Sequence, residues 1–439
     1  MTADGLLFRC TGCGAETTPS RAEPLPFRCP KAATSDGVDH VLARVRPAST
    51  TFSPGPEDDP FLRYRALSAA HALAAREGMS DAAYVARVAS LERAIAAVDG
   101  HGFRVTRTFR ADALERAIGA PGLELWVKDE TGDVSGSHKA RHLMGILLYL
   151  EVAREVGLLA GEPPRLAIAS CGNAALAAAV VARAGGLALE VFIPPDANAN
   201  VVARLRALGA AITVCPRTPA SPPGDPCVHA FRAAIAGGAL PFCCQGSDNG
   251  LTIDGGETLG YELAEAAPEL DAIFVQVGGG ALASAIAQGL RVARGALPRV
   301  YAVQTRGAAP LARAHERVAA RATASGSIEE SLAYAARHRA DFMWPWEETP
   351  RSVAHGILDD ETYDWLAVVC AMLESGGGPV VVDEATLLRA NEVARTTTGV
   401  AVDPTGSSGL AGLLQTVQAS GLRGRIAVVF SGRDRESCA

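Results

Sequence analysis

Short apolar segments alternate with alanine-rich amphipathic segments over most of the chain, from about residue 123 onward. Strands are predicted over residues 124–128, 166–169, 189–193, 212–215, 272–277, 300–304 and 426–430. Helices are predicted over residues 174–184, 200–208, 256–266 and 282–294. Because this alternation is typical of parallel strands covered by helices, we expect an α/β protein with two domains and mostly parallel, twisted sheets.

The chain before this alternation has a different character. Closely spaced cysteines occur near the N-terminus, and a stretch rich in Pro, Ser and Asp over 48–59 predicts a linker. Apolar residues at helical spacing follow over 61–97. The predicted regions are therefore a zinc-ribbon-like extension over 1–47, a linker and helical segment over 48–100, and a main region over 101–439 in which a smaller α/β subdomain occupies about 140–255.

Composition narrows the class of protein. The 439 residues are 48% hydrophobic and 20% charged, a balance typical of globular chains with large cores. A net charge of −7 favours neither nucleic acid nor an anionic membrane as a partner. Arg9 and Cys10 interrupt any signal-peptide pattern, and the longest apolar stretch contains Gly172 and Asn173. Ten cysteines, mostly single and among apolar residues, suit a reducing cytoplasm.

The N-terminal cysteines suggest a metal site. Cys10 and Cys13 form a C-x-x-C knuckle, whereas Cys29 stands alone because Lys31 occupies the region where a second cysteine would fall. His40 is the nearest candidate for a fourth ligand, and Asp36 and Asp39 are weaker candidates. Three thiolates and one imidazole can hold a tetrahedral zinc ion. The alternative is a degenerate ribbon that binds no metal.

Lysine is rare in this chain. Among 41 basic residues only Lys31, Lys128 and Lys139 are lysines. Because arginine carries an exposed charge equally well, a lysine here indicates amine chemistry, such as a Schiff base with an aldehyde. Lys139 ends the segment V-S-G-S-H-K, soon after an apolar run over 123–127. The alternative is a surface lysine that precedes a helix.

Two further motifs join a predicted strand to a predicted helix. Ser170-Cys171-Gly172-Asn173 would offer N–H groups and a helix dipole to a carboxylate or phosphate, unless Asn173 only caps the helix. Residues 278–280 are three glycines, a bare backbone cradle for a phosphate. They also fit the dinucleotide fingerprint, but the next strand ends in Gln304 rather than in the acid that would bind a ribose.

Two polar segments complete the candidate chemistry. Ser431 follows the last predicted strand and would point its hydroxyl beyond the carboxyl edge of the sheet, unless it only forms a Ser-Gly turn. The loop over 403–412 would line a substrate pocket or cap a helix. Candidates for substrate specificity are Arg351, His355, Thr405, Ser407 and Arg433.

Taken in order, these motifs resemble those of the tryptophan-synthase-β-like (fold type II) pyridoxal-phosphate enzymes. Residues 252–262 and 352–358 resemble the threonine synthases of that family, in which a cysteine-rich extension also occurs. The resemblance covers roughly residues 100–435. It implies pyridoxal 5'-phosphate as cofactor, a small amino-acid substrate and a homodimer.

The resemblance also implies a role for each matching residue. Lys139 would bind the cofactor as a Schiff base and act as the base at the substrate Cα, with His138 beside it. Asn173 would donate a hydrogen bond to the cofactor's 3-hydroxyl, and Ser431 would face its pyridine nitrogen. The cofactor's phosphate would be bound by the backbone of Gly278, Gly279, Gly280 and Ala281. The substrate would be bound by Ser170, Cys171 and Gly172 at its carboxylate, with Thr405 a further contact.

Three residues near Lys139 depart from the family pattern. His138 stands where Phe is usual, Ala140 where Asp or a similar residue is usual, and His142 where Gly is usual.

A neutral Ser431 facing the pyridine nitrogen would leave the cofactor ring unprotonated, which favours loss of a β or γ leaving group over transamination.

The favoured function is therefore elimination or replacement by a threonine synthase-like lyase, which converts O-phosphohomoserine and water to threonine and phosphate. The alternatives are a serine/threonine dehydratase-like ammonia-lyase, a β-replacement synthase of the cysteine or cysteate type, and a non-catalytic binding protein that keeps the fold.

Overall fold

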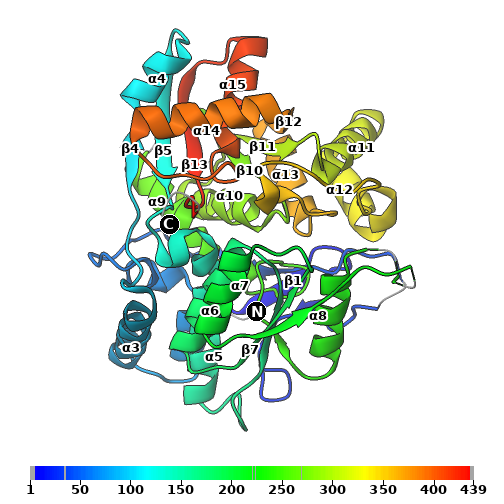
Figure 1. Cartoon of the computed structure of the whole chain (residues 1–439). Coiled ribbons are helices and arrows are strands. Elements are labelled where there is room, and N and C mark those ends of the chain that lie inside the picture. The colour runs from blue at the N-terminus through cyan, green and yellow to red at the C-terminus, as the bar shows by residue number, and fades with distance from the viewer. Residues whose placement is uncertain (1–4, 34–35, 220, 223, 268, 436–439) are drawn as a thin grey trace.

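The computed structural model describes residues 5–33, 36–219, 221–222, 224–267 and 269–435. Two helix-covered sheets lie one above the other in Figure 1, the larger in the upper half and the smaller in the lower half. This arrangement confirms the predicted α/β fold with mostly parallel sheets.

The larger sheet has six strands in the order β12-β11-β10-β13-β5-β4. All neighbours are parallel except β4, which is antiparallel to β5. The carboxyl ends of β5, β13 and β10 therefore meet at one edge of the sheet. The strands are β4 Thr108–Arg110, β5 Leu123–Asp129, β10 Ala272–Gln276, β11 Arg299–Thr305, β12 Gly378–Val382 and β13 Gly424–Phe430.

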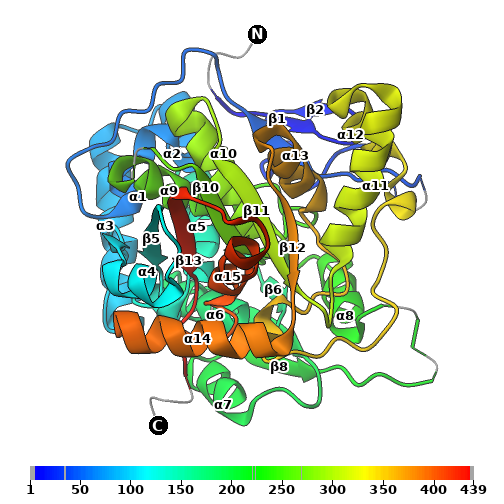
Figure 2. The same ribbon diagram turned by 90° about the horizontal axis from the view of Figure 1, so that it is seen from above.

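Helices cover both faces of this sheet. Ile273 and Val275 of β10 pack with α10 and α13 on one face, whereas Phe274 packs with α15 on the other. Figure 2 shows α14 and α15 apart from α10 and α13 in the view from above. The helices of this half are α4 Asp112–Ile118, α10 Ala281–Arg294, α11 Pro310–Ser325, α12 Ile328–Arg337, α13 Trp365–Ser375, α14 Glu384–Thr398 and α15 Ser408–Ser420.

The smaller sheet has four parallel strands in the order β8-β7-β6-β9. They are β6 Leu166–Ala169, β7 Leu189–Ile193, β8 Ala211–Val214 and β9 Leu240–Pro241. The accompanying helices are α5 Lys139–Glu155, α6 Asn173–Ala184, α7 Ala199–Ala207, α8 Pro226–Ala236 and α9 Thr252–Ala266. All seven predicted strands and four predicted helices are present, with ends that differ by up to four residues. In these two sheets and their helices, the strands β4, β9 and β12 and the helices α4, α5, α8, α11, α12, α13, α14 and α15 were not predicted.

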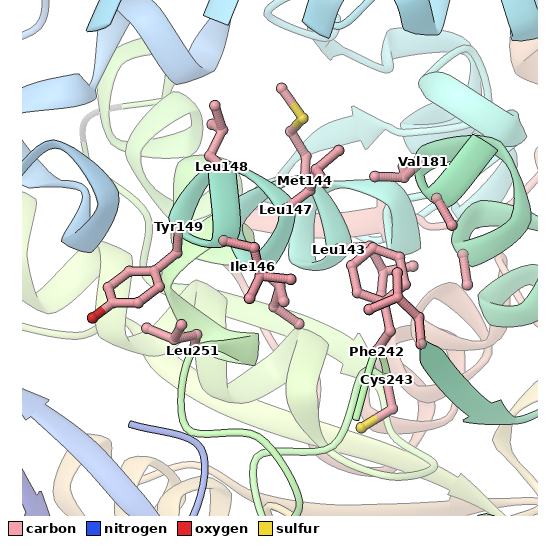
Figure 3. Packing of buried hydrophobic residues seen from close by; sticks show 14 of the residues in the cluster. Leu143, Met144, Ile146, Leu147, Leu148, Tyr149, Val181, Phe242, Cys243 and Leu251 are labelled. Carbon is pink, nitrogen blue, oxygen red and sulfur yellow. The ribbon is translucent and has the colours of Figure 1, made fainter. Parts of the chain in front are cut away.

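Helix α5 is buried on nearly all sides. Its middle turns contribute Leu143, Met144, Ile146 and Leu147 to the core, and Tyr149 is also buried. In Figure 3 these side chains point in several directions from the helix, toward residues of neighbouring elements such as Val181, Phe242 and Leu251. A helix that is apolar all round has no polar face, which is why hydrophobic periodicity did not predict it.

The backbones of α5, α9 and α10 approach closely at paired glycines. A Cβ added to Gly145 of α5 would lie 2.7 Å from the Cα of Gly255 in α9. A Cβ added to Gly260 of α9 would lie 2.9 Å from the Cα of Gly289 in α10. Because real Cβ atoms do not approach other atoms so closely, only glycine fits these contacts.

The N-terminal extension contains an antiparallel sheet in the order β2-β1-β3. Its buried residues, including Phe8 and Leu42, belong to the same hydrophobic cluster as α5. The predicted helical segment forms three helices, and the predicted linker packs Phe52 against Tyr64 with 6.1 Å between ring centroids. These elements are β1 Leu7–Cys10, β2 Glu16–Thr17, β3 Leu42–Val45, α1 Pro60–Arg63, α2 Ala69–Arg76 and α3 Asp81–Asp99. The division into domains stays a prediction.

Among the helices of the described residues, none is long and apolar enough to cross a membrane.

Candidate active site

Three predicted motifs meet at the carboxyl edge of the larger sheet. Ser431 directly follows β13, the glycine loop Gly278–Gly280 follows β10, and the segment that ends in Lys139 follows β5. Gln276, the last residue of β10, donates hydrogen bonds from Nε2 to Ser431 Oγ at 2.5 Å and to the Gly406 carbonyl at 2.8 Å. The buried hydroxyl of Ser431 therefore has a fixed position.

Lys139 is the first residue of α5, and the chain that precedes it runs beside Ser431. The His138 N–H donates to the Ser431 carbonyl at 3.1 Å, and Ser137 pairs with Gly432. A turn at Ser135, with φ of 57°, brings the chain back to this edge. The ε-amino group of Lys139 makes no hydrogen bond or ion pair within the residues that the structure describes. The Lys139 side chain is half-buried, and the residue before it is bonded to the Ser431 backbone.

The two imidazoles beside Lys139 are held neutral. Burial, reinforced by the positive charge of Lys139, lowers the pKa of His142 to about 3 and that of His138 well below its ordinary value. His142 Nδ1 lies 2.8 Å from the Thr252 carbonyl and must donate to it. His138 Nδ1 likewise lies 3.0 Å from the Ser431 carbonyl, which leaves Nε2 as a buried acceptor without a partner among the described residues. At neutral pH, His138 can accept a hydrogen bond but is not a charged acid.

The glycine loop lies under residues 357–364, which we call the covering segment. A Cβ at Gly278 would come within 2.3 Å of Asp359 Oδ2, and one at Gly279 within 3.0 Å of Tyr363 Cδ2. The Asp364 N–H donates to the Gly279 carbonyl at 2.8 Å. The glycines are therefore required by packing as well as by any ligand, and sequence motifs did not indicate this segment.

Asp359 places an anion on the glycine loop. Burial raises the pKa of its carboxyl to about 6, while the charge of Lys139 and a hydrogen bond from the Gly279 backbone act in the opposite direction. Its carboxylate lies against Gly278, in the loop that leads to the N-terminus of the 14-residue helix α10, and such a helix start attracts anions. A carboxylate bonded by the Gly279 N–H in a loop of bare glycines fits the donor set that a phosphate would need, and the role of Gly278, Gly279, Gly280 and Ala281 toward the cofactor stays a prediction.

A second buried carboxyl lies in the same segment. Burial raises the pKa of Asp364 to about 7, and the Gly246 N–H, 3.1 Å from Oδ2, acts in the opposite direction. The charge of Lys139 also lowers this pKa. The charge of Lys139 therefore acts on two carboxyls, of which Asp359 is mostly ionised and Asp364 partly protonated at neutral pH.

The smaller sheet contributes Asn173 to the same place. Asn173 begins α6, and its Nδ2 would lie 2.8 Å from a Cβ added to Gly432, the residue after Ser431. Arg435 Nε donates to Asn173 Oδ1 at 3.1 Å. The two sheets therefore meet between Asn173 and Ser431, as the predicted site requires.

The predicted carboxylate-binding motif faces open space. A Cβ at Gly172 would touch nothing within 4 Å, and the Gly172 N–H donates to Ser170 Oγ at 3.4 Å. Burial raises the pKa of Cys171, so that this residue is a neutral thiol. The roles of Ser170, Cys171 and Gly172 toward a substrate stay predictions.

The five candidates for substrate specificity lie in three different surroundings. Thr405 Oγ1 accepts from the Gly356 N–H at 3.0 Å, beside His355, and a Cβ at Gly406 would lie 2.7 Å from the Gly432 carbonyl. Thr405 and His355 are therefore close to the Ser431 turn. Arg433 lines a cavity of about 290 Å³ beside Gly136. Ser407 caps α15 and bonds to Asn391, while the Arg351 backbone packs against Gly307, so these two have structural contacts.

A buried ionic network supports the start of α5. Lys128 Nζ donates to Glu262 Oε2 at 2.5 Å, and Arg141 donates to Glu130 and Glu262. Lys128 and Arg141 are fully buried. The rarity of lysine suggested amine chemistry, but the contacts of Lys128 are those of a structural ion pair. Of Lys128 and Lys139, Lys139 is the one that lies with the other motifs at the carboxyl edge of the larger sheet.

The end of β11 does not offer a ribose ligand. Gln304 Oε1 accepts from the N–H groups of Leu311 and Ala312 at 3.0 and 3.1 Å, and its Nε2 donates to the Val277 carbonyl. The side chain is buried and its hydrogen bonds are directed to the protein. This arrangement counts against the dinucleotide alternative.

In the N-terminal extension, the predicted metal ligands do come together. The ligand atoms of Cys10, Cys13, Cys29 and His40 all lie within 4.8 Å of one another.

The α/β fold and the residues gathered at the edge of its larger sheet define an enzyme class of known families. The family model described as "Pyridoxal-phosphate dependent enzyme" matches residues 101–432. The chain therefore belongs to the family of pyridoxal-phosphate dependent enzymes. A curated protein of Sinorhizobium fredii that carries the provisional name threonine dehydratase is 27% identical over 224 residues, which are 50% of this chain and 61% of that protein.

Solved structures show the same fold at low identity. Maize serine racemase superimposes with a TM-score of 0.59 and 22% identity, over 80% of this chain and 94% of the racemase. Threonine deaminase isoform 2 of Solanum lycopersicum gives 0.58 and 16% identity, over 81% of this chain and 91% of the deaminase. An L-serine ammonia-lyase of Rhizomucor miehei gives 0.55 and 18% identity, over 75% and 94%.

Proposed function

We propose that this protein is a pyridoxal-phosphate dependent ammonia-lyase of the serine/threonine dehydratase type. The observation that carries the proposal is the neutral hydroxyl of Ser431, held by Gln276 beside the segment of Lys139. A hydroxyl opposite the pyridine nitrogen favours elimination of a β-substituent, since it does not stabilise a protonated ring. The similarity to proteins named for deamination favours this function over the threonine synthase reaction.

Each residue of the site would have a distinct task. The bound cofactor supplies an electron sink for the bond at the substrate Cα. Lys139 would hold it covalently and move the Cα proton. The N–H groups of Gly278, Gly279, Gly280 and Ala281 would bind its phosphate after Asp359 withdraws, and Asn173 would orient its ring through the 3-hydroxyl. Ser170, Cys171, Gly172 and Thr405 would bind the amino-acid substrate.

His138 would position the substrate or a water molecule rather than donate a proton to it. Its Nδ1–H is directed to the Ser431 carbonyl, and its Nε2 has no other partner among the described residues. A neutral imidazole at this point can accept a hydrogen bond from the substrate or from a water molecule.

Product analysis tests the proposal. The purified protein, supplied with pyridoxal phosphate, is expected to release ammonia and a 2-oxo acid from L-serine or L-threonine. Lys139→Ala should abolish this release and prevent borohydride from fixing the cofactor to the chain, whereas Lys31→Arg in the extension should retain both. Racemisation of the amino acid without ammonia would contradict the lyase assignment.

The threonine synthase reaction remains the second candidate, because residues 252–262 and 352–358 resemble that group. It predicts phosphate release from O-phosphohomoserine with no ammonia. A β-replacement synthase would instead need an external nucleophile before serine or an activated serine is consumed.

We also propose that the protein is a homodimer. Sedimentation of the purified protein would test this proposal.

A further inference from the structure

The N-terminal extension brings four potential metal ligands to one point. Cys10 is the last residue of β1, Cys13 lies in the turn after it, Cys29 lies in a later loop, and His40 lies just before β3. Cys10 and Cys29 are buried, Cys13 is exposed, and the His40 side chain is 8% exposed. Three thiols and an imidazole at a protected point form a donor set typical of structural zinc.

The distances suit a single ion. Cys13 Sγ and Cys29 Sγ are 3.6 Å apart, and Cys10 Sγ is 3.5 Å from His40 Nδ1. Around a tetrahedral zinc ion with usual bond lengths, neighbouring ligand atoms are separated by about 3.5–3.8 Å. The Cys13 N–H lies 3.5 Å from Cys10 Sγ and the Lys31 N–H 3.4 Å from Cys29 Sγ, so that backbone donors are directed at two of the sulfurs.

His40 is oriented as a ligand. Its Nδ1 faces Cys10, while its Nε2 lies 2.8 Å from Asp36 Oδ2. A carboxylate on the far nitrogen fixes the ring and makes the facing nitrogen available to a metal. His40, which lies just before β3, thus takes the place of the cysteine that the second knuckle lacks.

We propose that Cys10, Cys13, Cys29 and His40 bind one zinc ion in a closed structural site. Four protein ligands leave no position open for a substrate, so the ion would stabilise the extension rather than take part in chemistry. None of the four ligands belongs to residues 101–432, so zinc binding can be tested separately from the pyridoxal-phosphate function proposed above.

The residue beside His40 connects this site to the glycine loop. Asp39 Oδ1 accepts from Arg339 Nε at 3.1 Å, and Arg339 Nη2 is bonded to the carboxylate of Glu361. Glu361 belongs to the covering segment. The backbone adds two hydrogen bonds, from Asp39 to Ala336 at 2.7 Å and from Arg339 to Gly37 at 2.9 Å. The zinc ion would therefore hold the extension against the segment that covers the glycine loop, a consequence that rests on the proposed cofactor site.

Metal analysis of the full-length protein tests the site. Protein purified under reducing conditions is expected to contain about one zinc per chain, as a closed four-ligand site requires. Cys13→Ser should reduce the zinc content at least tenfold. Cys370→Ser, at a half-buried cysteine of α13, should retain one zinc per chain and serves as the matched control. Substituted cobalt should give the visible absorption of a tetrahedral thiolate site in the wild type and lose it in Cys13→Ser.

A milder variant distinguishes loss of zinc affinity from loss of folding. Asp36→Asn leaves all four ligands in place and should weaken zinc affinity about 10–100-fold. Wild-type protein that takes up no zinc or cobalt when reduced, or that contains a Cys13–Cys29 disulfide after isolation from cells, would overturn the metal site.

The connection to the cofactor has its own test. Arg339→Ala should retain one zinc per chain and weaken pyridoxal-phosphate affinity severalfold, measured by titration of the visible band. Unchanged cofactor affinity in this variant would refute the connection while leaving the zinc site intact. Zinc content and cofactor affinity thus separate failure of the site from failure of the proposed enzyme function.

Discussion

Arg141 Nε donates a 2.7 Å hydrogen bond to Glu130 Oε2, and both side chains are fully buried. Glu130 follows β5 and Arg141 lies in the first turn of α5, two residues after Lys139. Arg141 also donates to Glu262 of α9. The position of the candidate catalytic lysine is therefore fixed by an ion network that involves three elements.

Removal of Arg141 should destabilise the fold strongly. Arg141→Met leaves Glu130 and Glu262 without their main counter-charge in a dry interior, which typically costs about 3–5 kcal/mol. Urea denaturation would measure the change. Arg107→Met, at the exposed pair of Arg107 with Asp129, should cost about 1 kcal/mol or less. Equal effects of the two substitutions would contradict the role of the network.

Asp359 should compete with the cofactor's phosphate. Asp359→Asn removes a like charge beside the glycine loop, so pyridoxal-phosphate affinity should rise about tenfold, equivalent to about 1.4 kcal/mol. Because the pKa of Asp359 is raised to about 6, its carboxyl is ionised above that pH, and the gain should be larger at pH 8 than at pH 5. Titration of the apoprotein at both pH values would measure it.

Asp360→Asn is the matched control, since Asp360 is adjacent but its carboxylate is not the group placed against Gly278. An equal gain in this variant would mean that the effect arises from net charge rather than from contact with the loop.

His142 should reduce stability in acid. Its pKa falls from an ordinary 6.5 to about 3 in the folded chain because of burial. The unfolded chain therefore binds a proton that the folded chain does not, and stability present above pH 6.5 is lost as the pH falls from 6.5 toward 3. His142→Asn should lessen the drop in urea midpoint between pH 7.5 and pH 5. His101→Asn, at a more exposed histidine, should leave that drop unchanged.

Ser431 should govern the outcome of the reaction. Ser431→Asp would place a carboxylate at the pyridine nitrogen and favour its protonation. Ammonia release from L-serine should fall about tenfold, the factor for one pKa unit, while racemised substrate should increase. Ser431→Ala is the control, because it removes the hydroxyl without adding charge. Chiral chromatography with an ammonia assay gives the product ratio, and the same ratio in both variants would refute the assignment of Ser431.

Much of the fold was accessible from the sequence because amphipathic helices and short strands have distinct periods. Helix α5 was not, since residues such as Leu143 and Leu147 leave no polar face to define a period. The motif residues could be assigned to one edge because parallel strands share their carboxyl ends. That Asp359 and Tyr363 cover the glycine loop could not be predicted, since this depends on contacts between segments about 80 residues apart.

Lys128 shows the limit of an argument from rarity. Its scarcity suggested amine chemistry, but a lysine is equally suited to a buried ion pair with Glu262. Sequence does not show which of two lysines near one strand is turned toward a carboxylate. The distinction required the packing of α9 against β5.

The glycine contacts between α5, α9 and α10 fix the distance between the start of α5 and the start of α10. Lys139 begins α5 and Gly280 directly precedes α10, and these helices are joined through α9 by the pairs Gly145–Gly255 and Gly260–Gly289. Because backbone touches backbone at both pairs, no side chain can adjust by changing rotamer. The separation between the amine and the glycine loop is thus a fixed span, to which a ligand held at both ends must conform. One added methyl group at either pair would lengthen that span without altering any residue of the site.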